Sequence, residues 1–260
     1  MAPEIVIAVL SAGVSLVGVM VTALLAYRTA VVQHRLQEQS RRRSRQEVAE
    51  DLFRRYREPL LWSAYALQSR LFNVMTTNFL PRQLGDGDSP EQRYARDHTV
   101  YTIAEYLGWV EIVRREQRFL DIGAVPLTRE LLALLNRITG ILAHNRPGPF
   151  QLYRGGQRAV GELMQEYADE PTGPTRGVLG YAAFCERLDT DPRFAAWFAR
   201  LRADVDFVDA DDEQGSARVI ELQAALIDLV QLLDPKGDRV PADMRLKLAG
   251  LGEGGPTPAA

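Results

Sequence analysis

The chain has 260 residues, with 31 lysines and arginines against 34 aspartates and glutamates, and a net charge of −3. Its single cysteine, Cys185, excludes an internal disulfide and agrees with a domain that stays in the cytoplasm. Because the chain beyond its N-terminal region is acidic and has no basic surface pattern interleaved with aromatic residues, we expect no binding to nucleic acid.

The first predicted element is a transmembrane helix over residues 5–27, preceded by a short extracytoplasmic tail over residues 1–4. This segment carries no charge, and a helix of its length spans about 34 Å, enough to cross the roughly 30 Å core of a bilayer. A cleaved signal peptide would need a basic start and a shorter apolar core. Arginines follow the segment and none precedes it, which predicts a single-pass protein of the inner or plasma membrane with its N-terminus outside and its C-terminal domain in the cytoplasm.

Small side chains recur every three or four residues along this segment, so they fall on one stripe of the helix. The predicted packing residues are Ser11, Ser15, Gly18 and Thr22. Such a stripe lets two transmembrane backbones approach closely, which makes self-association one hypothesis. The other is that small residues are simply common in membrane helices.

A basic helical stalk is predicted over residues 28–57, which contain neither proline nor glycine and include nine arginines. The membrane-proximal basic residues are Arg41, Arg42, Arg43 and Arg45. In a straight helix Arg41 lies roughly 21 Å beyond Tyr27, farther than the roughly 8 Å over which charges act at physiological salt. Three interpretations stay open: a solvated stalk that signals topology, contact with anionic lipid, or contact with another partner.

Residues 58–249 are predicted to form one all-α cytosolic domain, a multi-helix bundle, followed by a disordered tail over residues 250–260. Alternation of apolar and polar residues with period two is absent, so no sheet is expected. The predicted helices begin at Pro59; at the capping box Ser89-Pro90-Glu91-Gln92; at Thr128; at Gly155, running to Tyr167; at Tyr181, to Leu188; at Pro192, capped by Asp191; and at Glu213, to Leu233.

Motifs for catalysis or metal binding are missing. No histidine or cysteine spacing typical of zinc occurs, and Gly161 is followed by Glu162 where a phosphate-binding loop needs lysine. We interpret Gly161 as a point of close approach between helices. The acidic residues from Asp204 to Glu213 break the register of a calcium-binding loop and predict a solvated turn. We therefore name no catalytic residue and expect no metal and no cofactor.

Three glutamines interrupt apolar helix faces: Gln68, Gln157 and Gln223. A buried amide without partners costs roughly 1 to 3 kcal/mol, so each must find hydrogen bonds. One interpretation is that these bonds fix the register of neighbouring helices. The other is a small polar pocket that binds a ligand, formed by Gln68, Arg70, Asn73, Gln157 and Glu162.

Four stretches resemble a group of bacterial helical proteins to which no activity is attached. They are Tyr56-Arg57-Glu58-Pro59-Leu60-Leu61, Leu67-Gln68-Ser69-Arg70-Leu71, Gln157 to Met164, and Leu222-Gln223 through Leu233-Asp234-Pro235. The resemblance implies a shared helical fold and no particular function.

The sequence as a whole predicts a non-enzymatic, membrane-anchored helical domain that interacts with a cytosolic protein partner or senses a ligand at the inner membrane face. The alternative is a membrane-tethered enzyme or effector with a polar pocket in the bundle. A catalyst would gather titratable groups in one cavity, whereas an interaction module needs an exposed apolar or charged face.

Overall fold

We describe the protein from a computed structural model, in which two compact units, Met1–Glu50 and Asp51–Ala260, are distinguished. The described residues of the second unit are 55–76, 89–117, 126–170, 173–206 and 213–248. In the first unit the structure describes five helical positions: Tyr27, Arg28, Gln33, Gln37 and Ser40.

Helices dominate the second unit, as predicted. In chain order they are residues 55–76, α3 (Pro90–Gln117), α4 (Pro126–Ala143), α5 (Arg154–Leu163), α6 (Tyr181–Thr190), α7 (Pro192–Asp206), α8 (Glu213–Leu233) and the 3-10 turn η2 (Ala242–Met244). Two strands, β1 (Gln165–Glu170) and β2 (Gly173–Val178), lie between α5 and α6. The prediction of a mostly helical bundle is confirmed.

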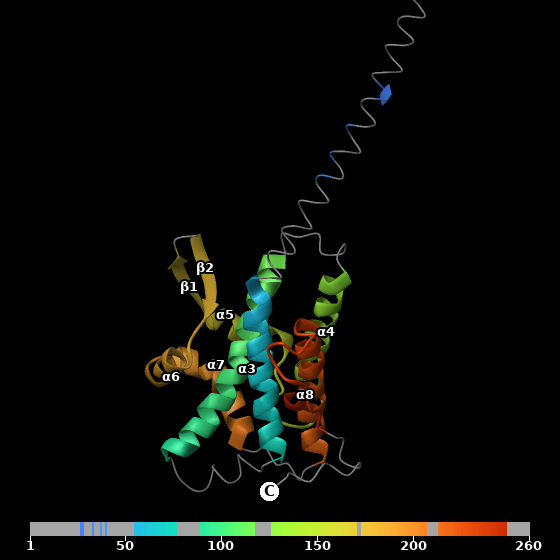
Figure 1. The fold of residues 1–260 in the computed structure, drawn as a ribbon. Coiled ribbons are helices and arrows are strands. Elements are labelled where there is room, and N and C mark those ends of the chain that lie inside the picture. Colours follow the sequence, from blue (N-terminus) through green and yellow to red (C-terminus); the bar gives the residue numbers. More distant parts are fainter. Residues whose placement is uncertain are drawn as a thin grey trace, which may run out of the picture. The chain divides into compact units, whose positions relative to one another are not determined.

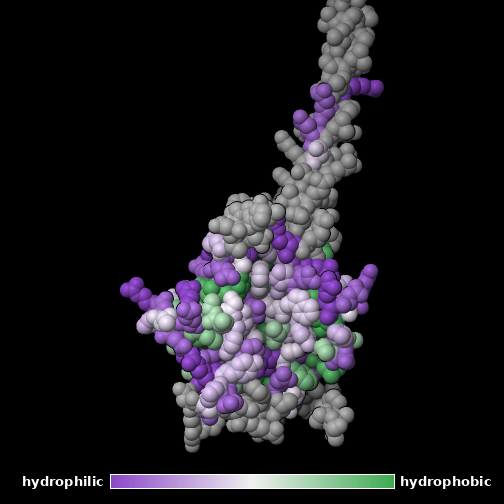
Figure 2. All heavy atoms as spheres, turned by 60° about the vertical axis from the view of Figure 1, so that its left-hand side comes forward, coloured by the Kyte–Doolittle hydropathy of each residue, from purple (hydrophilic) through white to green (hydrophobic). Residues whose placement is uncertain are grey.

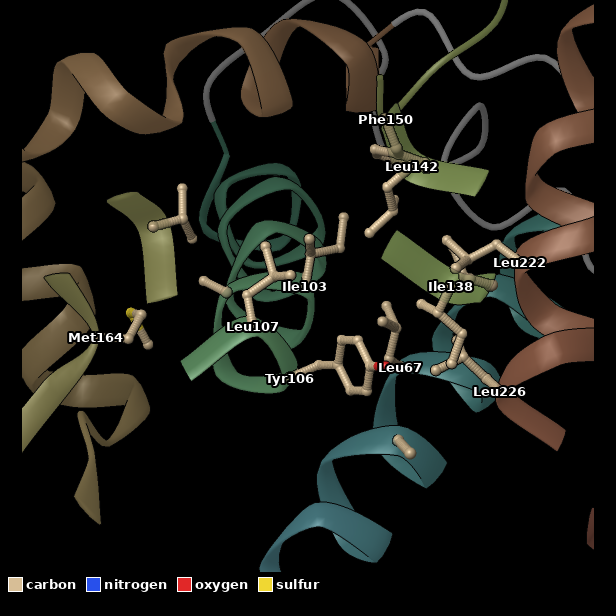
Figure 3. Packing of buried hydrophobic residues seen from close by; sticks show 14 of the residues in the cluster. Leu67, Ile103, Tyr106, Leu107, Ile138, Leu142, Phe150, Met164, Leu222 and Leu226 are labelled. Atoms are coloured by element: carbon tan, nitrogen blue, oxygen red, sulfur yellow. The ribbon is translucent and has the colours of Figure 1, made fainter. Parts of the chain in front are cut away.

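The 55–76 helix lies between α3 and α8, as Figure 1 shows. Its apolar stripe is buried, and Leu67 meets Tyr106 of α3 in the core (Figure 3). On the α8 side, Leu222 and Leu226 pack beside Ile138 of α4. One continuous apolar core therefore joins helices that are up to 160 residues apart in sequence, and its burial is the main favourable contribution to folding.

Two helix starts are confirmed in detail. The hydroxyl of Ser89 accepts the backbone N–H of Gln92 at 3.3 Å, and the Gln92 side chain accepts the N–H of Ser89 at 2.8 Å. This is the reciprocal pairing of a capping box. At α7, the carboxylate of Asp191 accepts the N–H groups of Arg193 and Phe194 at 2.9 and 3.2 Å. Both caps satisfy donors that a helix start leaves unpaired.

Three predicted boundaries are wrong. No new helix starts at Pro59, because residues 55–58 belong to the same helix and the side chain of Tyr56 already packs in the core. Helix α4 starts at Pro126 instead of Thr128, since proline at the first helical position loses no hydrogen bond. Helix α5 stops at Leu163, and the segment up to Tyr167 turns into β1.

The expectation that no sheet forms is also wrong. Strands β1 and β2 pair in antiparallel register, from Gln165 with Val178 to Glu170 with Gly173. Val178 packs against α3 at Gly108, where a Cβ atom would lie 2.9 Å from the valine side chain. The outer part of β1 exposes Tyr167. Glu166 and Tyr167 are neighbours in β1 and both are exposed, so they lack the alternation of buried and exposed side chains that reveals a strand.

No helix among the described residues is long and apolar enough to cross a bilayer. The predicted transmembrane segment up to Ala26, its packing residues Ser11, Ser15, Gly18 and Thr22, and most of the stalk lie outside those residues. So do the four basic residues Arg41, Arg42, Arg43 and Arg45, and the tail over residues 250–260.

Candidate functional site

Gln157 of α5 is buried, and its amide has structural partners. The Nε2 atom donates to the carbonyl oxygen of Thr139 in α4 at 3.0 Å and to that of Leu152 at 2.7 Å. One side chain therefore ties α5 to α4 and closes the loop between them. This matches the interpretation that buried glutamines fix the positions of neighbouring elements.

Arg70 and Asn73 belong to the 55–76 helix. The buried guanidinium of Arg70 donates to Thr99 Oγ1 at 2.8 Å and to the carbonyl oxygen of Ala95 at 2.9 Å, both in α3. Asn73 is exposed. Arg70 therefore fastens the 55–76 helix to α3 by hydrogen bonds from a charged donor, the stronger class of such bonds.

Glu162 is 44% exposed and pairs with Arg115 of α3 at 2.8 Å. Arg115 also pairs with the buried carboxylate of Glu111, and the two arginines Arg114 and Arg115 together lower the pKa of Glu111 against the effect of burial. Glu162 thus extends an ion-pair network between α3 and α5. The ligand-binding role predicted for Gln68, Arg70, Asn73, Gln157 and Glu162 stays a prediction.

Gln68 lies in a different place, against the C-terminal segment Met244–Leu248. Its Oε1 accepts the amide of Gln223 in α8 at 3.1 Å, and its Nε2 donates to the carbonyl oxygen of Met244 at 3.3 Å. Gln223 in turn donates to the carbonyl oxygen of Leu246 at 2.9 Å and accepts the N–H of Leu248 at 3.1 Å. The two buried amides thus bind the backbone of a segment that runs between the 55–76 helix and α8; we call this the glutamine groove.

Two exposed apolar side chains and a partly buried tyrosine border the glutamine groove. Trp62 is 44% exposed and lies edge-on to Tyr65, with ring centroids 6.0 Å apart, and the Tyr65 hydroxyl donates to the sulfur of Met244 at 3.1 Å. Met244 is itself 50% exposed. We call Trp62, Tyr65 and Met244 the tryptophan surface.

On the face shown in Figure 2, hydrophilic residues prevail and hydrophobic ones form small separate groups. Large exposed apolar side chains elsewhere, such as Trp197 and Tyr153, also occur. At the tryptophan surface an aromatic pair and a methionine from two distant segments meet, and protein interfaces favour these residue types.

A second cluster surrounds His98 on α3. The imidazole stacks on Tyr94 at 5.0 Å between ring centroids and meets Tyr181 of α6 edge-on at 5.4 Å. The ring of Tyr181 contacts that of Tyr101, which in turn contacts the ring of the buried Phe184. Among the described contacts His98 Nδ1 is buried without a hydrogen bond. Burial, and then the nearby Arg70 guanidinium, lower the pKa of His98.

The pH dependence of stability should report this cluster. The unfolded chain binds a proton at His98 near its ordinary pKa of 6.5, whereas the folded chain binds it only at lower pH. The free energy of unfolding is therefore highest above pH 6.5 and falls as the pH drops through the lowered pKa. Urea unfolding at pH 7.5, 6.5 and 5.5 should show a smaller fall in His98→Phe than in the wild type. His144→Phe, at an exposed position, is the control; equal slopes in all three chains would contradict the expectation.

Two buried ionic residues were missed from the sequence. Arg218 of α8 donates to the backbone carbonyl groups of His144, Arg146, Gly148 and Pro149, and so holds the whole loop after α4. Asp204 was assigned to a solvated acidic turn, but it is buried and accepts the N–H of Phe150 at 2.8 Å.

These two contacts explain an unusual backbone. Phe150 has φ of 60°, in the left-handed region that bulky residues rarely occupy, and its ring is completely buried. Arg218 and Asp204 hold the loop in this conformation. Helical spacing could have flagged Arg218, because it precedes Leu222 by four residues and so falls on the buried face of α8.

Comparison with family models, with curated proteins and with solved structures finds no match for this chain.

Proposed function

We propose that the chain is a membrane-anchored interaction protein whose helical domain binds a partner protein at the inner face of the membrane. The observation that carries the proposal is the tryptophan surface, in which the exposed side chains of Trp62 and Met244 meet at the partly buried Tyr65. Tryptophan and tyrosine supply most of the binding energy in protein interfaces because they bury a large apolar area with few rotatable bonds.

The polar interior favours a binding domain over an enzyme. Glu162 is in an exposed ion pair on α5, and Arg70 is buried against α3, so each serves the packing of the bundle. These two residues of the predicted polar pocket are thus engaged in holding helices together.

The membrane part of the proposal is supported by the sequence. Residues 5–27 carry no charge, and arginines follow them. A tethered domain meets membrane-associated partners at a raised local concentration, so a modest contact surface is sufficient.

The test is an affinity capture from detergent-extracted membranes with the full chain and two matched variants. Trp62→Ala should reduce the recovered partner at least about tenfold, the effect of an interface residue worth more than 1.4 kcal/mol. Trp197→Ala, at a tryptophan that is 50% exposed on α7, should leave recovery unchanged. Both variants should unfold at the wild-type urea concentration.

Two results would refute the proposal. Equal recovery of every captured protein by Trp62→Ala and Trp197→Ala would remove the tryptophan surface as the contact site. A full chain that stays in the supernatant when lysed cells are ultracentrifuged would remove the membrane anchor.

A further inference from the structure

The C-terminal segment occupies the glutamine groove in the manner of a bound peptide. Residues 245–248 have no regular secondary structure, and Gln223 bonds both the carbonyl oxygen of Leu246 and the N–H of Leu248. The Gln223 carboxamide bonds a C=O group and an N–H group that are two residues apart, so it recognises the backbone of the segment independently of its side chains. In domains that bind extended peptides, hydrogen bonds to the main chain of the peptide likewise supply the affinity.

Most side chains of the segment are exposed to solvent. Met244 and Leu246 are 50% and 53% exposed, and Lys247 is also exposed. Arg245, between them, points inward: its guanidinium pairs with Asp234 at 2.6 Å and donates to the carbonyl oxygens of Asp234 and Val240. Arg245 is thus the residue of the segment whose side chain is held by the turn that follows α8.

Charge defines what the groove accepts. The pocket for Arg245 ends in the buried carboxylate of Asp234, and Lys247 pairs with Asp228 of α8 at 2.5 Å. Because the two carboxylates meet residues two apart in this segment, they favour a segment of the form Arg-x-Lys. A planar guanidinium fits the first position better than an ammonium because it donates to several oxygens at once.

We propose that the glutamine groove binds a basic segment of a partner protein, with an arginine paired to Asp234, and that residues 245–248 fill the groove in cis until the partner displaces them. This inference rests on the proposed function and names the partner's chemistry. The tethered segment competes at an effective concentration on the order of millimolar, so the cis contact keeps weak ligands out.

The test uses the purified full chain and a fluorescent peptide with the sequence of residues 242–248. Arg245→Ala in the chain removes the anchor of the cis segment and leaves the groove intact, so the peptide should bind at least about tenfold more tightly than to the wild type, as measured by fluorescence anisotropy. Arg239→Ala is the matched control, because Arg239 is an exposed arginine of the same turn that pairs with Glu58. The Arg239→Ala chain should bind the peptide with the same affinity as the wild type.

Further arms make the outcome decisive. Adding Gln223→Leu to Arg245→Ala should abolish binding, and a peptide with alanine in place of its arginine should not bind. If Arg245→Ala does not fold, excess peptide should still accelerate hydrogen exchange at the Leu248 amide of the wild type.

Three results would overturn the inference. The first is a folded Arg245→Ala chain that does not bind the peptide or, if that chain does not fold, an unchanged exchange rate of the Leu248 amide in the wild type. The second is a scrambled peptide that binds with the same affinity. The third is a variant that forms dimers by exchanging C-terminal segments, because a second copy would then be the occupant of the groove. Because no membrane or partner is present, these outcomes are independent of the Trp62→Ala capture.

Discussion

Replacing Asp234 by alanine is expected to destabilise the domain by about 3 to 5 kcal/mol, the cost of removing one partner from a buried, hydrogen-bonded charge pair. The carboxylate follows the last residue of α8 and is almost completely buried. It accepts the N–H groups of Asp238, Arg239 and Val240 at 3.1, 3.0 and 2.9 Å, in addition to the Arg245 guanidinium. The substitution leaves all four donors without this acceptor.

Urea unfolding followed by far-UV circular dichroism measures this loss. Asp238→Ala is the control: its side chain is exposed and its N–H is kept, so we expect a change within about 0.5 kcal/mol. A loss below about 1 kcal/mol in Asp234→Ala would show that water replaces the carboxylate and that the turn does not anchor the C-terminal segment.

The contribution of Asp234 should also depend on pH. Burial would raise the pKa of this carboxyl group, but the N–H groups of Val240 and Arg239 and the Arg245 guanidinium outweigh burial and lower the pKa below the ordinary 3.8. The ionised form is therefore favoured in the folded state. The stabilisation is complete above pH 3.8 and is lost as the pH falls through the lowered pKa, so the gap between wild type and Asp234→Ala should narrow there.

The elements that the sequence predicted correctly carry local signals. The capping box at Ser89 and the cap at Asp191 depend on residues within one helical turn, and both are present as hydrogen bonds. The end of α8 at Asp234-Pro235 is equally local. Patterns that are complete within a few residues survive folding because tertiary contacts do not compete with them.

The features that sequence reasoning missed depend on distant contacts. The hairpin between α5 and α6 packs through Val178 on α3, and the loop at Phe150 is held by Arg218, almost 70 residues later. Gln68 and Gln223 were recognised as buried amides, yet their shared target, the C-terminal segment, carries no pattern of its own. Backbone recognition leaves no signature in the sequence of the segment that is recognised, so the glutamine groove required the structure.

The close approach predicted at Gly161 is present and leads to the second large effect. A Cβ atom there would lie 2.6 Å from the carbonyl oxygen of Leu107 and 2.8 Å from Glu111 Cβ, both in α3. Neither atom is the end of a flexible side chain, so α5 must move away from α3. Gly161→Ala should therefore destabilise the domain by about 1 to 3 kcal/mol, the usual cost of overpacking, although alanine is the better helix former.

Gly140→Ala is the matched control within α4, because a Cβ atom at Gly140 meets nothing within 4 Å. Here helix propensity acts alone, and the free energy of unfolding should rise by about 0.5 to 1 kcal/mol. The two glycine-to-alanine changes are chemically identical. If they change the free energy of unfolding in opposite directions, the cost of the helix contact is separated from the gain in helix propensity. If Gly161→Ala proved as stabilising as Gly140→Ala, α3 and α5 would not be in contact at Gly161, and the Arg115–Glu162 ion pair between them would lose its structural basis.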